Sequence, residues 1–166
     1  MRFEERRQFF KWATKSAATP FWYGKLYGDE IPSYIVFKHE WPDYYFNDTR
    51  PLDGRCFSII LDGEAIGQIN YNQIDPITRQ VDLDILIASQ ENQGHGYGSD
   101  AIYTLTRYLF EEMGVSTCKI EVSPANPRAI KAYRKAGYEE TDSFTQNDIP
   151  WLEMKVEAED FALISA

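Results

Sequence analysis

The stretch ENQGHGYGSDAI, residues 91–102, places three glycines within five residues and then continues into an apolar helical pattern. Glycines give up side-chain packing and cost backbone entropy, so this run indicates that something requires bare backbone here. Ile102, Leu105 and Leu109 recur at helical spacing after it, and Gly114 fits the end of that helix. The sequence predicts a loop followed by a helix over 99–113, and the question is whether the loop holds a dinucleotide, a nucleotide triphosphate, another anion or no ligand.

Length and composition limit the classes of protein that fit. The 166 residues show no repeat, low-complexity tract or linker, which predicts a single domain over residues 1–166. With 26 acidic and 17 basic residues the net charge is −9, which disfavours nucleic acid and anionic membranes as partners. We find no signal-peptide core and no apolar run that could cross a membrane, so we expect a cytoplasmic protein. Cys56 and Cys118 form no metal-binding pattern, and we expect no metal.

Hydrophobic periodicity and turn residues predict alternating helices and strands. Asp62-Gly63 between two β-rich runs predicts a hairpin, and Asn126, Pro127 and Gly137 punctuate a helix. The elements we expect are a helix over 4–18, a short helix within 20–46, a hairpin over 55–74, a strand over 81–88, a helix over 99–113, a strand over 117–122, a helix over 126–137 and a strand over 151–156. This order indicates an α/β or α+β domain with a mixed sheet.

Three kinds of anion site are possible for the glycine loop. A triphosphate-binding loop of the GxxxxGK[ST] type needs a lysine, and none lies between Lys38 and Lys119. A dinucleotide fingerprint matches Gly96, Gly98 and Ala101, but SQENQ separates the loop from its strand and too little chain follows. The remaining possibility is a loop whose bare amides and helix N-terminus hold a pyrophosphate without a basic side chain.

Two stretches resemble the GNAT superfamily of N-acetyltransferases. QGHGYG, residues 93–98, resembles the family's Q/R-x-x-G-x-G/A signature, and SPANPRAIKAYRKAGYEE, residues 123–140, resembles its second signature. The resemblance covers about 55–156 and is nearest to the branch that acetylates the 6′ amine of aminoglycosides. It implies the GNAT fold, a mixed, mostly antiparallel central sheet with helices on both faces and strands splayed at the cofactor site. The family usually opens with a strand, for which three residues before the first helix leave little room.

The resemblance also implies an acetyl-CoA site. In the family the pyrophosphate lies on the loop, the pantetheine arm follows the preceding strand, and a tyrosine protonates the departing thiolate. Tyr133 matches that tyrosine, although its ring could instead pack in the core. The cofactor-binding positions are Ile87, Ala88, Gln93, Gly94, His95, Gly96, Tyr97, Gly98, Ser99 and Asn126.

Asp84 is the candidate catalytic base. It lies inside an apolar strand, two residues after Asp82 and on the same face. The pair could simply face solvent, or Asp84 could deprotonate the incoming amine or anchor its ammonium group. By resemblance to the aminoglycoside branch, Asp84 falls on the catalytic aspartate, and Asp82 is the substitute, assigned here to substrate binding.

The stretch 21–46 holds ten aromatic residues among four acidic ones, Asp29, Glu30, Glu40 and Asp43. Aromatic faces and carboxylates attract ammonium groups, so we expect an acceptor site here that includes Trp22 and Tyr23, although packing into the core would explain most of the rings. The prediction is an acetyl-CoA-dependent N-acetyltransferase, monomeric or homodimeric, that acts by direct transfer on a small amine resembling an aminoglycoside. The alternatives are a protein N-terminal or polyamine acetyltransferase and a non-catalytic CoA-binding module.

Overall fold

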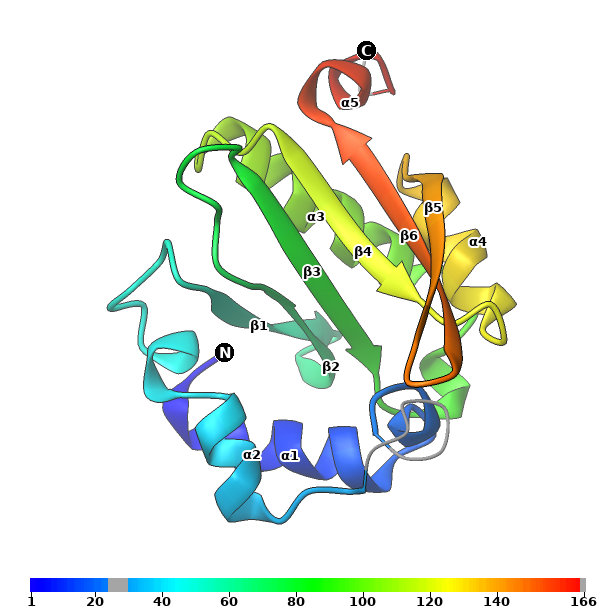
Figure 1. Ribbon diagram of the computed structural model, residues 1–166. Coiled ribbons are helices and arrows are strands. Elements are labelled where there is room, and N and C mark those ends of the chain that lie inside the picture. The colour runs from blue at the N-terminus through cyan, green and yellow to red at the C-terminus, as the bar shows by residue number, and fades with distance from the viewer. Residues whose placement is uncertain (24–29, 165–166) are drawn as a thin grey trace.

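A six-stranded mixed sheet forms the centre of the protein, with the strand order β1-β2-β3-β4-β6-β5 (Figure 1). The computed structural model describes residues 1–23 and 30–164. Only β3 and β4 pair in parallel, and every other neighbouring pair is antiparallel. The strands are β1 (Arg55–Leu61), β2 (Glu64–Tyr71), β3 (Gln80–Ile87), β4 (Thr117–Val122), β5 (Glu139–Gln146) and β6 (Ile149–Glu157). The predicted mixed, mostly antiparallel sheet is confirmed.

The predicted hairpin between β1 and β2 turns at Asp62 and Gly63. Their φ angles of 50° and 86° are both positive, as a type I′ turn requires. The turn fixes the register, in which Leu61 pairs with Glu64. As a result β2 presents Ile69 and Tyr71 to one face of the sheet, and Gln68 and Asn70 lie on the other, since side chains alternate along a strand.

The sheet is split between its two central strands. β3 pairs with β4 only where Gln80, Val81 and Asp82 face Thr117, Cys118 and Lys119. Beyond these pairs both strands continue and diverge, as Figure 1 shows. The splayed strands expected from the family resemblance are therefore present, and the split opens at the end of β3 from which the glycine loop leaves.

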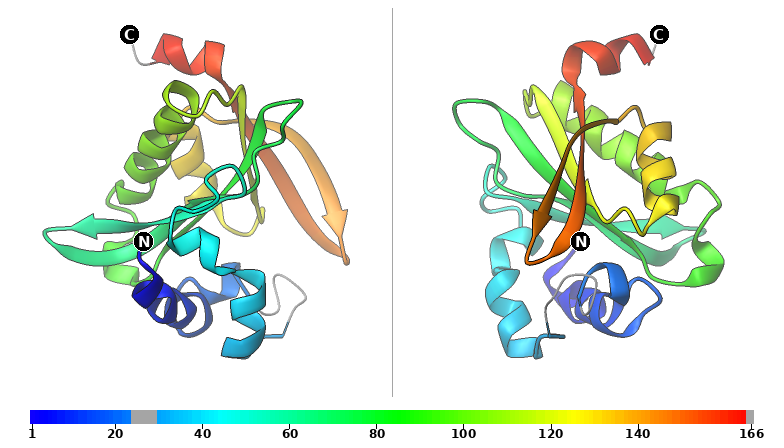
Figure 2. Two further views of the ribbon diagram at one scale, coloured as in Figure 1. Left: turned by 90° about the vertical axis from the view of Figure 1, so that its left-hand side faces the viewer. Right: turned by 45° about the vertical axis from the view of Figure 1, so that its right-hand side comes forward.

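Helices cover both faces of the sheet (Figure 2). α1 (Arg6–Lys15) and α2 (Tyr34–Glu40) lie on one face, and α3 (Tyr97–Glu111) and α4 (Pro127–Lys135) lie on the other. Each layer has its own buried core. Leu86 of β3 packs with Phe9 and Phe37 under α1 and α2, whereas neighbouring strand residues pack against Ile102 and Leu109 of α3.

The first helix is shorter than predicted. Residues 3–5 form a 3-10 turn and α1 ends at Lys15, not at residue 18. The hydroxyl groups of Ser16 and Thr19 accept hydrogen bonds from the backbone amides of Ala18 and Ser16, at 3.1 and 2.9 Å, so they compete with the helix. No strand precedes α1 among the described residues, and β1 is an edge of the sheet.

Two elements were not predicted, the edge strand β5 and the final helix α5 (Ala158–Ile164). β5 has the sequence EETDSFTQ and is exposed almost throughout, so it lacks the apolar alternation that marks a half-buried strand. It forms because it pairs with β6 across a turn in which Asn147 and Asp148 both have positive φ. In α5, Phe161 packs against Tyr103 and Phe110 of α3, with ring centroids 4.9 and 5.4 Å apart.

No helix in the described ranges 1–23 and 30–164 is long and apolar enough to cross a membrane. Of the acidic residues in the aromatic stretch, Asp29 lies outside the described residues.

Candidate active site

A cavity of about 880 Å³ follows the split between β3 and β4 and is lined by residues from both helical layers. Trp22 and Trp41 line it on the side of α1 and α2. The glycine loop and Tyr133 line it on the side of α3 and α4. Because the split joins the two faces of the sheet, one ligand can reach the loop and another can approach from the aromatic side.

The glycine loop takes a conformation that most residues avoid. Gly94 and Gly96 have φ angles of 86° and 95°, and Gly96 is the N-cap of α3. Gln93 anchors the loop, because its Nε2 donates to the carbonyl oxygen of Ile87 at 2.9 Å and its Oε1 accepts from Arg128 at 2.8 Å. The residues present therefore fit a pyrophosphate, which bare amides and a helix N-terminus can hold.

Most of the predicted cofactor-binding residues line the cavity. From the loop these are Gln93, Gly94, His95, Gly96, Gly98 and Ser99, together with Ile87 of β3 and Asn126 before α4. Tyr97 stacks on the exposed ring of His95, with ring centroids 5.9 Å apart, and does not line the cavity. Ala88 also lies outside the lining, and its amide donates to the Ile66 carbonyl oxygen at 3.0 Å.

The N-cap of α4 determines where Tyr133 lies. The Asn126 side chain accepts a hydrogen bond from the Ala129 amide at 3.2 Å, and Pro127 occupies the first turn. The helix then runs so that Tyr133 is buried at 7% exposure while it lines the cavity. Asn126 therefore caps α4 and also lines the cavity. Tyr133 packs in the core and also lines the cavity.

Asp84 lines the cavity and is held by Asn70 of β2 and by Asn72, which directly follows β2. The Nδ2 atoms of Asn70 and Asn72 each donate to Asp84 Oδ2 at 3.0 Å. Asn72 Oδ1 accepts from the Tyr45 hydroxyl at 2.9 Å, and Asn70 Oδ1 accepts from Gln68 Nε2 at 3.2 Å. Asp84 is therefore the end of a polar network that fixes one carboxylate oxygen.

Burial raises the pKa of the Asp84 carboxyl above its ordinary value of 3.8. The hydrogen bonds from Asn70 and Asn72 act in the opposite direction, and the nearby charges of Asp82 and Glu121 add to the increase. A carboxylate with a raised pKa is a stronger base than an exposed one. This environment suits the predicted role in removing a proton from an amine.

Asp82 occupies a different environment, although it shares the face of β3. Its Oδ1 lies 2.9 Å from Lys119 Nζ on β4, and its side chain is 48% exposed. Lys119 also lies within 3.7 Å of Glu153 and 3.3 Å of Glu121. Asp82 belongs to this charged cluster on the sheet, so of the two aspartates only Asp84 lines the cavity.

Aromatic side chains form the wall of the cavity opposite the loop. Trp22 Nε1 donates to the Ile85 carbonyl oxygen at 3.2 Å, and the Tyr23 hydroxyl donates to Glu40 Oε2 at 2.8 Å. Trp22 and Trp41 have ring centroids 5.9 Å apart. Burial raises the pKa of Tyr23 well above its ordinary value, so its hydroxyl stays neutral. The wall therefore presents aromatic rings and a carboxylate to the cavity.

Four residues of the site were not predicted from the sequence, namely Tyr45, Asn70, Asn72 and Glu121. A signal for the asparagines was present, because GQINYN places Gln68, Asn70 and Asn72 at alternate positions in an otherwise apolar strand. Polar side chains at that spacing form a row on one face. Glu121 lines the cavity from β4, but its position depends on the split in the sheet.

Neither cysteine lines the cavity, and both are buried. Burial raises the thiol pKa of Cys56 and of Cys118 well above the ordinary value, which keeps them protonated and poorly nucleophilic. Within the part of the chain that the structure describes, no three His, Cys, Asp or Glu side chains gather as a metal site.

Comparison with known proteins assigns the class. The family model described as "Acetyltransferase (GNAT) domain" matches residues 1–139, so the chain belongs to the GNAT acetyltransferases. The predicted family and enzyme class are confirmed.

The individual proteins that the chain resembles are named for two kinds of acceptor, aminoglycosides and spermidine. The chain is 26% identical over 149 residues to the aminoglycoside N(6′)-acetyltransferase type 1 of Klebsiella pneumoniae, covering 85% of this chain and 72% of that protein. It matches the crystal structure of the aminoglycoside acetyltransferase AAC(6′)-Ib with coenzyme A and kanamycin at a TM-score of 0.79, with 21% identity and coverage of 100% and 96%. It also matches spermidine N-acetyltransferase from Vibrio cholerae with CoA and spermine at 0.80, with 18% identity and coverage of 98% and 95%.

Proposed function

We propose that this protein transfers an acetyl group from acetyl-CoA to a primary amine of a small polycationic acceptor of the aminoglycoside type. The observation that carries the proposal is the separation of positive and negative charge within the cavity. Bare amides and the cations of α4 line it beside the glycine loop, whereas Asp84, Glu40 and Glu121 line it on the aromatic side. An anionic cofactor and a cationic acceptor would thus each meet the opposite charge.

For acetyl-CoA, the loop offers its amides and the α3 N-terminus to the pyrophosphate. The end of β3 at Ile87 and Ala88 would run along the pantetheine arm, with the Ile87 carbonyl shared with Gln93. Asn126 and Tyr133 line the cavity near the split, where the thioester would lie. Bound there, acetyl-CoA supplies an activated acetyl group.

In the reaction the amine nitrogen forms a bond to the acetyl carbon, and the bond from that carbon to sulfur breaks. An amine is protonated at neutral pH and must lose a proton before it attacks. We assign that proton to Asp84, directly or through one water molecule. We assign the protonation of the departing thiolate to Tyr133, which is buried in the cavity wall. The second proton, which the nitrogen loses as the amide forms, then restores the Tyr133 hydroxyl.

The acceptor would lie between the aromatic wall and Asp84. Trp22, Tyr23 and Glu40 can hold ammonium groups through ring faces and a carboxylate. Asp82 is a candidate for a second ammonium group of a long acceptor, since it lies two residues from Asp84 on the same face. Direct transfer in a ternary complex fits this arrangement, because neither cysteine lines the cavity.

The likeness to spermidine acetyltransferases favours a polyamine as the second candidate acceptor. A thiol-release assay with acetyl-CoA and matched panels of aminoglycosides, polyamines and peptides with free N-termini separates the candidates. We expect the highest kcat/KM with an aminoglycoside. Calorimetric binding of acetyl-CoA without CoA release from any amine would instead indicate a CoA-binding module.

A further inference from the structure

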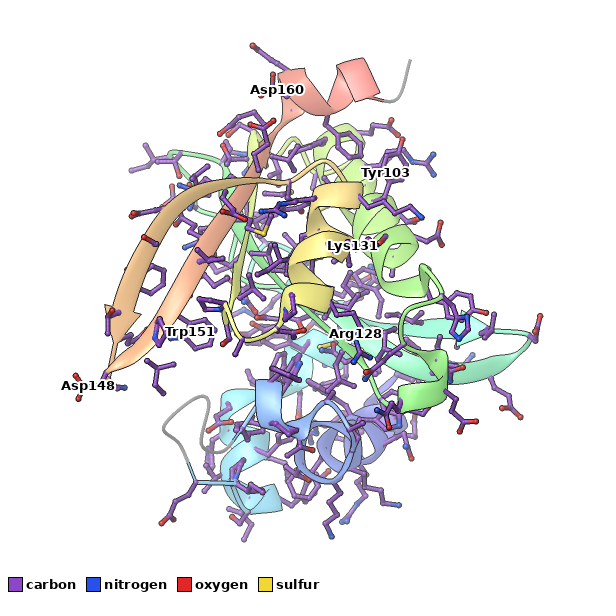
Figure 3. The ribbon with its side chains drawn as sticks, turned by 90° about the vertical axis from the view of Figure 1, so that its right-hand side faces the viewer. Tyr103, Arg128, Lys131, Asp148, Trp151 and Asp160 are labelled. Atoms are coloured by element: carbon purple, nitrogen blue, oxygen red, sulfur yellow. The ribbon has the colours of Figure 1, made fainter. Side chains whose placement is uncertain are left out.

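Three cations form a stripe along one side of α4. Arg128, Lys131 and Lys135 are spaced three and four residues apart, so they project from the same side of the helix, and all three line the cavity. Figure 3 shows Arg128 near the N-terminal end of α4, beside the loop that precedes α3, and Lys131 further along the helix, toward α3.

The two ends of the stripe lie against different parts of the glycine loop. Arg128 donates to Gln93 Oε1 at 2.8 Å. A Cβ placed on Gly96 would lie 3.8 Å from Lys135 Nζ. The stripe therefore runs alongside the loop from its first residue to the N-cap of α3, with Lys131 between.

This concentration of positive charge stands out in a protein whose net charge is −9. The carboxylates that line the cavity belong to Glu40, Asp84 and Glu121, on α2, β3 and β4. The acidic residues near the loop, Glu91 and Asp100, are exposed and do not line the cavity. Among the described residues, the charged side chains on the loop side of the cavity are thus all cationic, which favours a ligand with more than one anionic group there.

A pyrophosphate alone does not account for all of these charges. The loop amides and the helix N-terminus suffice for it, and Arg128 is already bonded to the loop through Gln93. This leaves the charges of Lys131 and Lys135, which lie one turn apart on the side of α4 that faces the cavity. Two lysines together suit a phosphate monoester, which carries a charge of about −1.5 to −2 at neutral pH.

We propose that Lys131 and Lys135 bind the 3′-phosphate of coenzyme A and so make the protein select CoA over its 3′-dephospho form. The inference rests on the proposed function, because it assumes that the cavity holds this cofactor. It adds the residues that distinguish CoA from other nucleotide thiols with the same pyrophosphate and pantetheine.

The test is calorimetric titration with CoA and with 3′-dephospho-CoA. The protein should bind CoA about tenfold more tightly, the combined effect of two partly exposed charge pairs. The double variant Lys131→Gln/Lys135→Gln should bind both ligands equally, with the affinity that the unaltered protein has for 3′-dephospho-CoA. Lys11→Gln/Lys15→Gln, the same loss of two charges at exposed positions of α1, should keep the full preference.

Two outcomes would overturn this inference and leave the proposed function intact. One is equal affinity of the unaltered protein for the two ligands. The other is a double variant that loses the same factor for both, which would assign the lysines to the pyrophosphate. Binding of neither ligand would overturn the proposed function too, so the two failures are distinguishable. The melting temperature of each variant establishes that it is folded.

Discussion

At the scale of single residues, Asp84 is the group whose surroundings depart furthest from those of a surface carboxylate. Two asparagine donors hold one of its oxygens, and burial raises its pKa. Asp84→Asn keeps the size and the hydrogen-bond acceptor but removes the base. We expect kcat to fall by about 10²-fold or more, the usual contribution of general base catalysis. Steady-state kinetics with Asp82→Asn as the control should show a far smaller change for that variant.

The pH profile gives an independent check on Asp84. The base must be ionised to act, so kcat/KM should rise with pH as the carboxyl loses its proton, and the midpoint should lie above 3.8. Asp84→Asn should remove this rise. A profile that is the same in the variant would mean that another group accepts the proton.

The same carboxylate should reduce the stability of the fold. A pKa raised in the folded state means that the folded protein binds this proton more tightly than the unfolded chain does. The stabilisation from that proton is present at low pH and is lost as the pH rises through the folded pKa. At neutral pH Asp84→Asn should therefore raise the melting temperature while it lowers turnover. Calorimetry at pH 7 measures this, and a lower melting temperature would contradict it.

Tyr133 is tested by removing only its hydroxyl. Tyr133→Phe keeps the ring that packs in the core, so the affinity for CoA should change little. If the hydroxyl protonates the thiolate, kcat should fall by roughly 10²-fold. Turnover and calorimetric affinity measured on the same preparation separate the two effects, and unchanged turnover would exclude the acid role.

At the scale of elements, the start of α3 depends on a backbone conformation that favours glycine. Gly96 has a φ of 95°, and the nearest atom to an added Cβ would be Lys135 Nζ at 3.8 Å, so the cost of Gly96→Ala is strain and not a clash. We expect a loss of about 1–2 kcal/mol in the free energy of unfolding. We also expect weaker CoA binding, because the loop amides would be misdirected.

Gly63→Ala provides the matched control. Gly63 has a φ of 86° in the β1–β2 turn, nothing lies within 4 Å of an added Cβ, and neither turn residue lines the cavity. It should lose a comparable amount of stability by chemical denaturation and keep its affinity for CoA. Equal CoA affinity in both alanine variants would show that the conformation at Gly96 serves folding alone.

Elements with strong local signals could be predicted from the sequence. The β1–β2 hairpin has its Asp-Gly turn, and α4 has its cap, its proline and its terminal glycine. β5 could not be found by periodicity, because its stability comes from pairing with β6 and both of its faces are largely exposed. α5 was missed as well, although Glu159 and Asp160 supply acidic residues for its first turn.

The site was predictable where one segment carries it and not where several segments meet. The glycine loop and Tyr133 lie within the two stretches that resemble the family. The hydrogen bonds to Asp84 come from Asn70 of β2 and from Asn72 just after it, and Asn72 is in turn held by Tyr45, 39 positions before Asp84 in the numbering. Such contacts follow from strand register, which local sequence does not reveal. For the same reason the ion pair between Asp82 and Lys119 could not be foreseen.

At the scale of the whole molecule, charge is distributed so that the acceptor side is acidic within an acidic protein. A polycationic acceptor should therefore bind less tightly as salt is added. Between about 0.1 and 1 M salt the Debye length shortens from about 10 to about 3 Å. We expect KM for a polycationic aminoglycoside to rise several-fold over this range, and KM for a simple monoamine to rise much less. Equal increases would show that ring contacts and not charge hold the acceptor.

The three residue pairs between β3 and β4 also have a mechanical consequence. A sheet normally transmits load through a continuous ladder of hydrogen bonds, but here the ladder is interrupted at its middle. A ligand bound in the gap would contact both halves of the sheet. It would therefore couple the half that ends in β3 to the half that begins with β4, which the polypeptide alone does not do there. Saturation with acetyl-CoA at 100 times its dissociation constant should add about 2.7 kcal/mol to the free energy of unfolding. The backbone amides of β3 and β4, on the two sides of the gap, should then both exchange their hydrogens more slowly.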